Sequence, residues 1–356
     1  MSQNYYSKLD VFRFIAIFLV LIEHFAIFLG RKISAGYYGV DMFFVLSGFL
    51  ITGILMKPTN SSALKSWINF LGRRALRIFP IYYLTILVLF LLGYSPVRDN
   101  LAVLIFYFYN YAWVAYEIPL SGVSHFWSLA VEEQFYFIWP ALILFVFRKN
   151  NNKILISAFI IYLMCTLQLI FNIIPNVSKF NGVGLFPQAN SLLLGAIGAI
   201  LFKQNKLPFK LLENKAFEIS AYIMLVFVLT IDSEIKYFIA PLISLFLIFK
   251  CVTGTFQVEL VNRFFSIKQL IYLGSISYGI YIYHLPLDYY LTKYLFDPYI
   301  WDKINFSNLG SLSKLEFHAW IIKFPIYSII SIIIAHFSFK YFEKPILKYK
   351  DRFFPN

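Results

Sequence analysis

Charged residues are scarce in this chain, and their scarcity excludes most soluble proteins. Only 14% of the 356 residues are charged, against 60% that are hydrophobic, whereas soluble domains carry about 25% charged residues. The mean hydropathy is +0.70. No long polar stretch separates the apolar segments between Val11 and Lys340, and such a composition cannot bury its apolar surface in water. We therefore predict one membrane domain over residues 1–356.

Cysteine and acidic residues are also in short supply. Cys165 and Cys251 lie in or at the end of apolar runs without CxxC spacing, so neither a disulfide framework nor a metal site is indicated. Only 18 Asp and Glu oppose 31 Lys and Arg, for a net charge of +13. The basic residues cluster in short loops between apolar runs. This is the positive-inside pattern of membrane proteins, and it argues against nucleic acid as a partner.

The sequence does contain a series of apolar runs of about 17 to 25 residues, long enough to cross a bilayer as helices. They lie near residues 11–30, 38–56, 78–94, 126–147, 154–174, 188–202, 217–232, 236–251, 270–295 and 321–340. No small-residue cleavage site follows the first run, so we expect it to be a retained span.

The run 101–114 is shorter than the others and is interrupted by Asn110. If it does not cross, the basic loops all fall on one side together with both termini. We therefore predict an all-α polytopic membrane protein, a bundle of about ten transmembrane helices with both termini cytoplasmic. Residues 95–125 are then an outer loop that holds a re-entrant or interfacial helix.

Ionisable residues inside apolar runs are costly in a bilayer, so they mark candidate sites. In the first run Asp10 and Arg13 lie one helical turn apart, and His24 follows about 15–20 Å further along the helix. One helix thus carries polar groups at two depths. An interfacial ion pair explains Asp10 and Arg13 equally well, and His24 can instead be a histidine hydrogen-bonded inside the bundle.

Asp41 lies near the outer end of the second run and can approach the depth of His24 if the two helices are neighbours. A carboxylate beside a histidine fixes its tautomer and raises its basicity, which suits a general base for a hydroxyl. The alternative is that Asp41 caps its own helix. Ser47 in the same run favours helix packing over a role as nucleophile.

Three arginines, Arg73, Arg74 and Arg77, precede the third run. On a helix, the i, i+3 spacing of Arg74 and Arg77 places them on one face. Such a fork of guanidinium groups suits the phosphates of a nucleotide-containing donor such as coenzyme A. Topological charge and contact with lipid headgroups are the competing explanation.

The fourth run begins SHFWSLAVEEQFYFIWP, with Glu132 and Glu133 about 10 Å below the outer surface. At least one of these carboxylates must face a polar interior. There they can hold a proton or orient a substrate hydroxyl, or they can belong to a structural buried network. His125 lies close by. The late segment SISYGIYIYHLPL carries His284, about 20 Å from the inner end of its run.

Taken in order, these segments resemble the acyltransferase-3 family of membrane O-acyltransferases. The matching segments, which extend from Leu9 to Pro345, are LDVFRFIAIFLVLIEH, GVDMFFVLSGFLIT, RRALRIFPIYY, HFWSLAVEEQFY, SISYGIYIYHLP and YFEKP. The match covers nearly the whole chain in sequence order. The resemblance implies a ten-span bundle in the bacterial plasma (inner) membrane that acylates sugars, usually with acetyl drawn from cytoplasmic acetyl-CoA.

The residues and the resemblance together give three groups of candidate site residues. The catalytic group is His24, Asp41, Glu132, Glu133 and Arg13, the group that binds the acetyl-CoA cofactor is Arg73, Arg74 and Arg77, and the substrate-binding group is Asp10, His125, Trp127, Ser128 and His284. In this hypothesis Asp41 or Glu133 orients His24. His24 either deprotonates the acceptor hydroxyl or carries the acyl group briefly.

Many relatives of this family carry an extracytoplasmic SGNH esterase-like domain after the bundle, whereas this chain ends at Asn356. We therefore expect a stand-alone enzyme that acylates a cell-surface or lipid-linked glycan, such as O-antigen, capsule or exopolysaccharide, rather than peptidoglycan. One alternative is a proton-coupled transporter or flippase of a glycan intermediate, which predicts inverted repeats. The other is a non-catalytic assembly subunit, in which substitutions at His24 and Glu133 change only abundance.

Overall fold

The computed structural model describes residues 5–26, 30, 33–175, 179–231, 233–299 and 323–355, and every regular element in these ranges is a helix. In chain order the helices are α1 (Ser7–Phe25), α3 (Ala35–Leu55), α4 (Ala63–Leu91), α5 (Ser95–Asp99), α6 (Leu101–Ile105), α7 (Tyr109–Ala115), α8 (Phe126–Ala141), η1 (Leu142–Val146), α9 (Asn151–Phe171), α11 (Leu185–Lys203), α12 (Phe209–Leu212), α13 (Lys215–Thr230), α14 (Lys236–Thr253), α15 (Glu259–Phe264), α16 (Lys268–Ser275), α17 (Ser277–Leu291), η2 (Thr292–Phe296), α18 (Asp297–Tyr299), α19 (Phe324–Ser338), η6 (Phe339–Glu343), α20 (Lys344–Leu347) and α21 (Lys350–Phe353). The predicted all-α class is confirmed for the described residues.

Seven helical segments in the described chain are long and apolar enough to cross a membrane. They are Ala35–Leu55, Ala63–Leu91, Phe126–Val146, Asn151–Phe171, Leu185–Lys203, Lys236–Thr253 and Phe324–Phe353. Helix α1 has 19 residues but includes four charged ones, while α13 has 16 residues and α17 has 15. The count of about ten spans and the cytoplasmic position of both termini therefore stay predictions.

Several helix boundaries differ from the predicted spans. Helix α4 begins at Ala63, well before the predicted span 78–94, so the arginines that precede this span lie within a continuous helix of 29 residues. The predicted span 270–295 is interrupted at Ile276, between α16 and α17, and α17 continues through Pro286. Residues 27–29 of the first predicted span and 321–322 of the last lie outside the described residues.

The segment 101–114 folds as two short helices, α6 of 5 residues and α7, which begins at Tyr109 and has 7 residues. At about 1.5 Å per residue neither can cross a hydrocarbon core of about 30 Å. This agrees with the prediction that the segment does not cross. Between the two helices Tyr107 has a φ of 57°, which sends the chain into a sharp turn.

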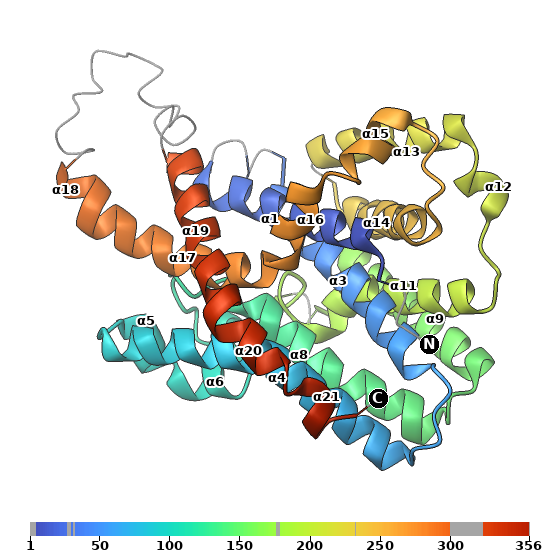
Figure 1. The fold of residues 1–356 in the computed structure, drawn as a ribbon, viewed down its shortest axis with the longest axis horizontal. Helices are drawn as coiled ribbons and strands as arrows, with labels where there is room; N and C mark the ends of the chain where they lie inside the picture. The colour runs from blue at the N-terminus through green and yellow to red at the C-terminus, as the bar shows by residue number, and fades with distance from the viewer. Residues whose placement is uncertain are drawn as a thin grey trace.

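Helix α3 lies in the middle of the bundle, between α1 and α11, and Figure 1 shows α1 and α3 in blue crossing the centre of the molecule. A Cβ on Gly48 would overlap the backbone of Leu192, and one on Gly195 would overlap the backbone of Val45. These glycines let α3 and α11 approach closely.

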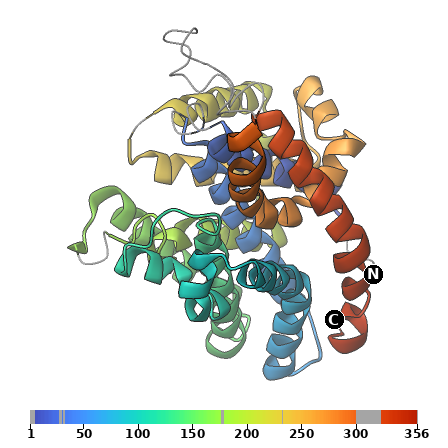
Figure 2. The ribbon, with the colours of Figure 1, turned by 90° about the vertical axis from the view of Figure 1, so that its left-hand side faces the viewer.

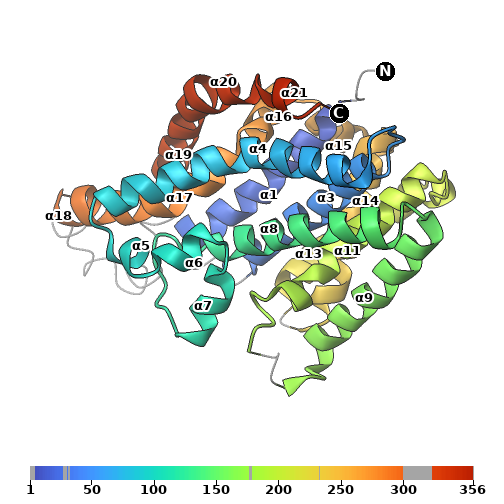
Figure 3. The ribbon, with the colours of Figure 1, turned by 90° about the horizontal axis from the view of Figure 1, so that it is seen from below.

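Helices α4 and α8 lie side by side across the lower face in Figure 3. In Figure 2 the C-terminal helices from α19 to α21, drawn in red, run down one side of the molecule. Together α1, α3, α4, α8 and α17 surround the polar interior of the bundle, which holds the candidate site.

Candidate active site

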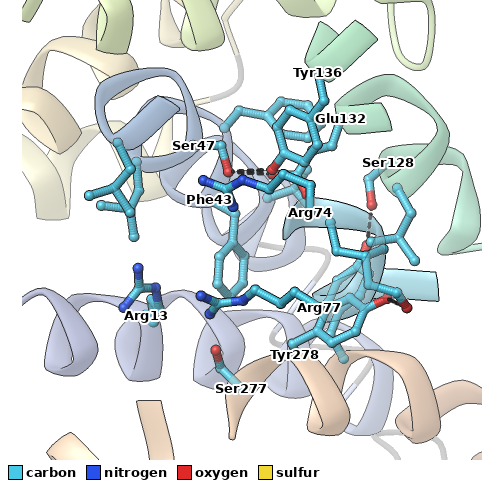
Figure 4. A pocket seen from close by; sticks show the side chains of 17 residues that line it. Arg13, Phe43, Ser47, Arg74, Arg77, Ser128, Glu132, Tyr136, Ser277 and Tyr278 are labelled. Atoms are coloured by element: carbon cyan, nitrogen blue, oxygen red, sulfur yellow. Dashed lines mark hydrogen bonds between the residues drawn. The ribbon is translucent and has the colours of Figure 1, made fainter. Parts of the chain in front are cut away.

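A cavity of about 740 Å³, including its open mouth, lies between α1, α3, α4, α8 and α17. Its walls combine aromatic and aliphatic side chains with a small set of polar ones. The polar lining residues are Arg13, Ser47, Arg74, Arg77, Ser128, Glu132, Tyr136, Ser277, Tyr278 and Tyr281. Figure 4 shows the guanidinium groups of the three arginines directed into this first cavity. An apolar pocket with a few converging polar groups is the usual form of a small-molecule site.

The three arginines concentrate positive charge in the first cavity. Arg13 pairs with Asp10, which also accepts a hydrogen bond from Tyr5. Within the described residues, neither Arg74 nor Arg77 forms a salt bridge. Both lie on one face of α4, as their spacing predicts. Since neither is paired with a carboxylate there, both are available to an anionic ligand.

Arg73 differs from the other two arginines. Its guanidinium donates to the carbonyl oxygen of Phe354 at 2.7 Å and lies 2.8 Å from Asp351. Arg73 does not line the first cavity, because adjacent helical residues point about 100° apart. The structure therefore places Arg73 against the C-terminal segment and separates it from Arg74 and Arg77.

Three histidines from distant parts of the sequence meet beside the first cavity. The ring centroids of His24 and His284 are 4.9 Å apart, and those of His284 and His125 are 4.7 Å apart. Nδ1 of His24 lies 3.2 Å from Nε2 of His284. His284 and His125 are almost completely buried, whereas His24 is half-buried. The structure thus brings together three of the residues singled out in the sequence.

Backbone carbonyls set the proton positions in this histidine cluster, because a carbonyl can only accept a hydrogen bond. His284 Nδ1 lies 2.6 Å from the carbonyl of Tyr281, and His24 Nδ1 lies 3.0 Å from the carbonyl of Val20. Both Nδ1 atoms therefore carry the proton. Nε2 of His284 accepts from His24 Nδ1–H, which is shared with Val20. Nε2 of His24 is left as the basic nitrogen.

A hydroxyl pair connects the first cavity to the histidines. Ser128 Oγ and Tyr281 Oη, both in the cavity wall, are 2.5 Å apart, and they lie 3.0 and 3.1 Å from the carbonyl oxygen of His125. One hydroxyl therefore donates to the other, which donates to that carbonyl. The ring of Tyr281 lies 5.5 Å from that of His284. Tyr281 was missed in the sequence, although its position one helical turn before His284 places both on one face of α17.

The two adjacent glutamates face different surroundings. Glu132 lines the first cavity and accepts a hydrogen bond of 2.6 Å from Ser47, which itself accepts from Tyr136 at 3.0 Å. Glu133 lines a second cavity between α4, α8 and the α6–α7 turn, and its Oε1 is buried without a partner among the described residues. The prediction that at least one of them faces a polar interior agrees with this arrangement.

Asp41 is not hydrogen-bonded to His24, contrary to the hypothesis that it orients that ring. Its carboxylate accepts from Ser191 and, at 3.4 Å, from Ser244, on α11 and α14. Asp41 thus joins a separate polar cluster between α3, α11 and α14. Trp127 packs edge-on against Phe44, with ring centroids 6.2 Å apart, and lines neither cavity.

Metal ligation does not emerge from this geometry. In the part of the chain that the structure describes, no group of three or more His, Cys, Asp and Glu residues is arranged to hold a metal ion. Each of the three clustered histidines contacts a backbone carbonyl through one ring nitrogen, and His24 also contacts His284.

An arginine-rich cavity whose wall includes Tyr281, beside His284, fits a domain that transfers an acyl group. The acyltransferase-3 model, described as "Acyltransferase domain", matches residues 6–339. The chain therefore belongs to the acyltransferase-3 family, and the resemblance found in the sequence is confirmed.

Particular relatives are similar over nearly the whole chain. O-acetyltransferase OatA of Staphylococcus aureus is 26% identical over 379 aligned positions, which cover 98% of this chain and 58% of that protein. Peptidoglycan O-acetyltransferase OatA of Listeria monocytogenes is 28% identical over 376 positions, covering 98% and 56%. The chain thus spans a little over half the length of these curated relatives. No solved structure matches.

Proposed function

We propose that this chain is a membrane O-acetyltransferase that moves acetyl from cytoplasmic acetyl-CoA to a hydroxyl of a surface or lipid-linked glycan. Family membership and the O-acetyltransferase names of the relatives support the reaction type. The observation that carries the proposal is the first cavity, because it joins Arg74 and Arg77 to the hydroxyls of Ser128 and Tyr281. The ring of Tyr281 in turn lies beside that of His284.

The charge of the donor suits the first cavity. Coenzyme A carries phosphates, which guanidinium groups bind through charge-assisted hydrogen bonds. Arg13, Arg74 and Arg77 supply three such groups in one cavity. With the phosphates on these arginines, the thioester reaches toward Ser128 and Tyr281, next to the histidine cluster.

His24 has the tautomer that a general base requires. Nε2 of His24 takes the proton from the acceptor hydroxyl while that oxygen attacks the thioester carbonyl. The new carbon–oxygen bond forms, the carbon–sulfur bond breaks, and the coenzyme A thiolate receives the proton from His24. His284 accepts the hydrogen bond from His24 Nδ1–H and so stabilises the imidazolium between the two steps, as the third member of a catalytic triad does.

The same lone pair on Nε2 of His24 can instead attack the thioester and hold the acetyl group before the acceptor arrives. Both routes place the reacting carbonyl beside His24 and need the same tautomer. They differ in one observable, which is whether an acetyl-enzyme accumulates without acceptor.

For the acceptor we propose a glycan hydroxyl, with peptidoglycan included in the class. The Listeria relative is named a peptidoglycan O-acetyltransferase. The proposed class of acceptors is therefore broader than the O-antigen, capsule or exopolysaccharide expected from the sequence. This chain aligns with only part of each relative. The proposal therefore covers only the chemistry inside the helical bundle.

The test is transfer of radiolabelled acetyl from acetyl-CoA to glycan in membranes that contain the chain or its His24→Ala variant. His336→Ala is the matched control, because His336 lies on α19 and contacts Tyr272, away from the cavity. We expect label with the wild type and His336→Ala and none with His24→Ala. Equal transfer by His24→Ala at equal abundance would remove the proposed mechanism.

A further inference from the structure

A second cavity lies on the side of the bundle, between α4, α8 and the turn that joins α6 to α7. Most of its lining side chains are aromatic or aliphatic, and several of those are exposed on the outer surface of the bundle. The exposed apolar lining residues are Ile68, Phe106, Phe108, Phe137 and Ile138. In a membrane bundle such a mouth opens into lipid, so a ligand entering it comes from the bilayer and carries a hydrocarbon chain.

Two of the residues that line this apolar cavity each have a buried polar atom without a partner among the described residues. Oε1 of Glu133 and the hydroxyl of Tyr107 are both buried and unbonded within the described residues, and both residues line the cavity. Only 7% of Tyr107 is exposed. A buried polar group without a hydrogen bond costs about 1–3 kcal/mol, so two of them in one cavity point to a ligand that supplies hydroxyl groups.

Although its hydroxyl is unbonded, the backbone and the ring of Tyr107 are held in place by neighbouring residues. Gln134 donates to the backbone carbonyl of Tyr107 at 2.7 Å and to the Asn110 side chain at 3.0 Å. The Tyr107 ring stacks on Tyr82, with centroids 4.5 Å apart and planes 19° apart. Since φ of Tyr107 is positive, this conformation persists only because the surroundings impose it. The hydroxyl therefore has a fixed position in the cavity.

We propose that the second cavity binds a lipid-linked saccharide, with sugar hydroxyls bonded to Glu133 and Tyr107 and the hydrocarbon chain packed along α4 and α8. A carboxylate accepts hydrogen bonds from sugar hydroxyls, and a phenol both donates and accepts. This inference rests on the proposed function, because it names the site of the acceptor. Arg74 lines both cavities, so the donor and acceptor sites share a wall.

The binding test uses photoreactive lipids and the full chain in nanodiscs, without acetyl-CoA. One probe is a C15 isoprenyl diphosphate N-acetylglucosamine with a diazirine in the isoprenyl chain, and the other is the same lipid without the sugar. We expect the sugar lipid to label peptides from 104–111 and 133–138. Tyr107→Phe and Glu133→Gln should each weaken that labelling roughly five- to tenfold, the loss expected for one hydrogen bond.

The matched control is Tyr116→Phe, because Tyr116 belongs to the same outer segment but is 77% exposed and does not line the cavity. Its labelling should equal that of the wild type. Thermal unfolding of each variant checks that the bundle remains folded. Equal labelling by both probes with no effect of Tyr107→Phe or Glu133→Gln would mean that the cavity takes any membrane lipid, and labelling elsewhere would overturn the site.

The two proposals fail separately in these experiments. Normal labelling of the cavity by the sugar lipid, combined with no acetyl transfer, would leave the lipid site standing and count against the proposed enzyme. Acetyl transfer that depends on His24, combined with no sugar-dependent labelling, would leave the enzyme standing and remove the second cavity as the acceptor site.

Discussion

Nδ1 of His24 lies 3.2 Å from Nε2 of His284, although the two histidines are 260 residues apart in the sequence. The contact joins α1 to α17, and the backbone carbonyls of Val20 and Tyr281 orient the two rings. His284 thereby holds the proton of His24 on Nδ1. The basic lone pair of His24 stays on Nε2, where the proposed reaction needs it.

His284→Ala removes the acceptor for His24 Nδ1–H, so we expect kcat to fall about 10- to 100-fold, the usual effect of losing an orienting partner. The KM for acetyl-CoA should change little, because His284 does not line the first cavity. His284→Gln should recover part of the loss, since its amide oxygen can accept the same hydrogen bond. Steady-state kinetics of the three proteins in proteoliposomes measure the effect; an unchanged kcat in His284→Ala would contradict it.

Acetyl-CoA without acceptor distinguishes the two routes through His24. If Nε2 acts only as a base, the protein should retain no label after denaturation and rapid gel filtration. If Nε2 carries the acetyl group, label should remain up to one per chain, be lost on addition of acceptor, and be absent in His24→Ala. We expect no label, because Nε2 of His24 acts as the base in the proposed reaction and makes no bond to the acetyl group. Mass spectrometry of the peptide that contains His24 gives the answer.

Helical spacing made part of this site predictable. The i, i+3 pattern placed Arg74 and Arg77 on one face, and the intramembrane histidines at 24 and 284 were recognised because ionisable groups are rare inside apolar runs. The same reasoning missed Tyr107 and Tyr281, because tyrosine is abundant in this chain, with 26 copies. No feature of the local sequence distinguishes the few tyrosines that line cavities.

What the sequence could not supply was the rotation of each helix about its axis. The position of Asp41 along α3 was compatible with a contact to His24. The rotation of α3 about its axis instead directs this carboxylate to Ser191 on α11. Likewise, Glu132 and Glu133 have the same depth but face different cavities. Rotation is decided by long-range packing, here by the close contact of α3 with α11 at Gly48.

Asp41→Asn tests the separation of Asp41 from the histidines. The amide can still bond to Ser191 and Ser244, but it loses the charge-assisted part of those hydrogen bonds. We expect a lower unfolding temperature, and a kcat per folded molecule within about threefold of the wild type. Fluorescence-detected size exclusion after heating, together with kinetics on the folded fraction, provides both numbers. A loss of kcat as large as that in His24→Ala would return Asp41 to the catalytic group.

Gly48→Val should disrupt the packing of α3 against α11. Its added side chain would overlap the backbone of Leu192, and overpacking of a tight contact costs about 1–3 kcal/mol or more. Gly53→Ala is the matched control, because Gly53 lies on the same helix and an added Cβ there meets nothing within 4 Å. We expect Gly48→Val to lose most of its folded protein while Gly53→Ala keeps or slightly raises its unfolding temperature. Equal stability of the two variants would contradict the close approach.

The neighbouring arginines of α4 test whether the first cavity binds the acetyl donor and the second cavity binds the acceptor. Arg77 lines only the first cavity, Arg74 lines both, and Arg73 lines neither. Arg77→Ala should therefore raise the KM for acetyl-CoA about tenfold, the effect of one lost charge-assisted contact, and leave the KM for a lipid-linked sugar unchanged.

Arg74→Ala should raise the KM for both substrates, because its side chain forms the wall between the two cavities. Arg73→Ala should leave both KM values unchanged and lower only thermal stability, since its partners are Asp351 and the carbonyl of Phe354. Bisubstrate kinetics at two ionic strengths measure all three variants, and higher salt should weaken donor binding most in the wild type. A shared effect of the three substitutions would instead indicate that these arginines act through overall charge, without distinct sites.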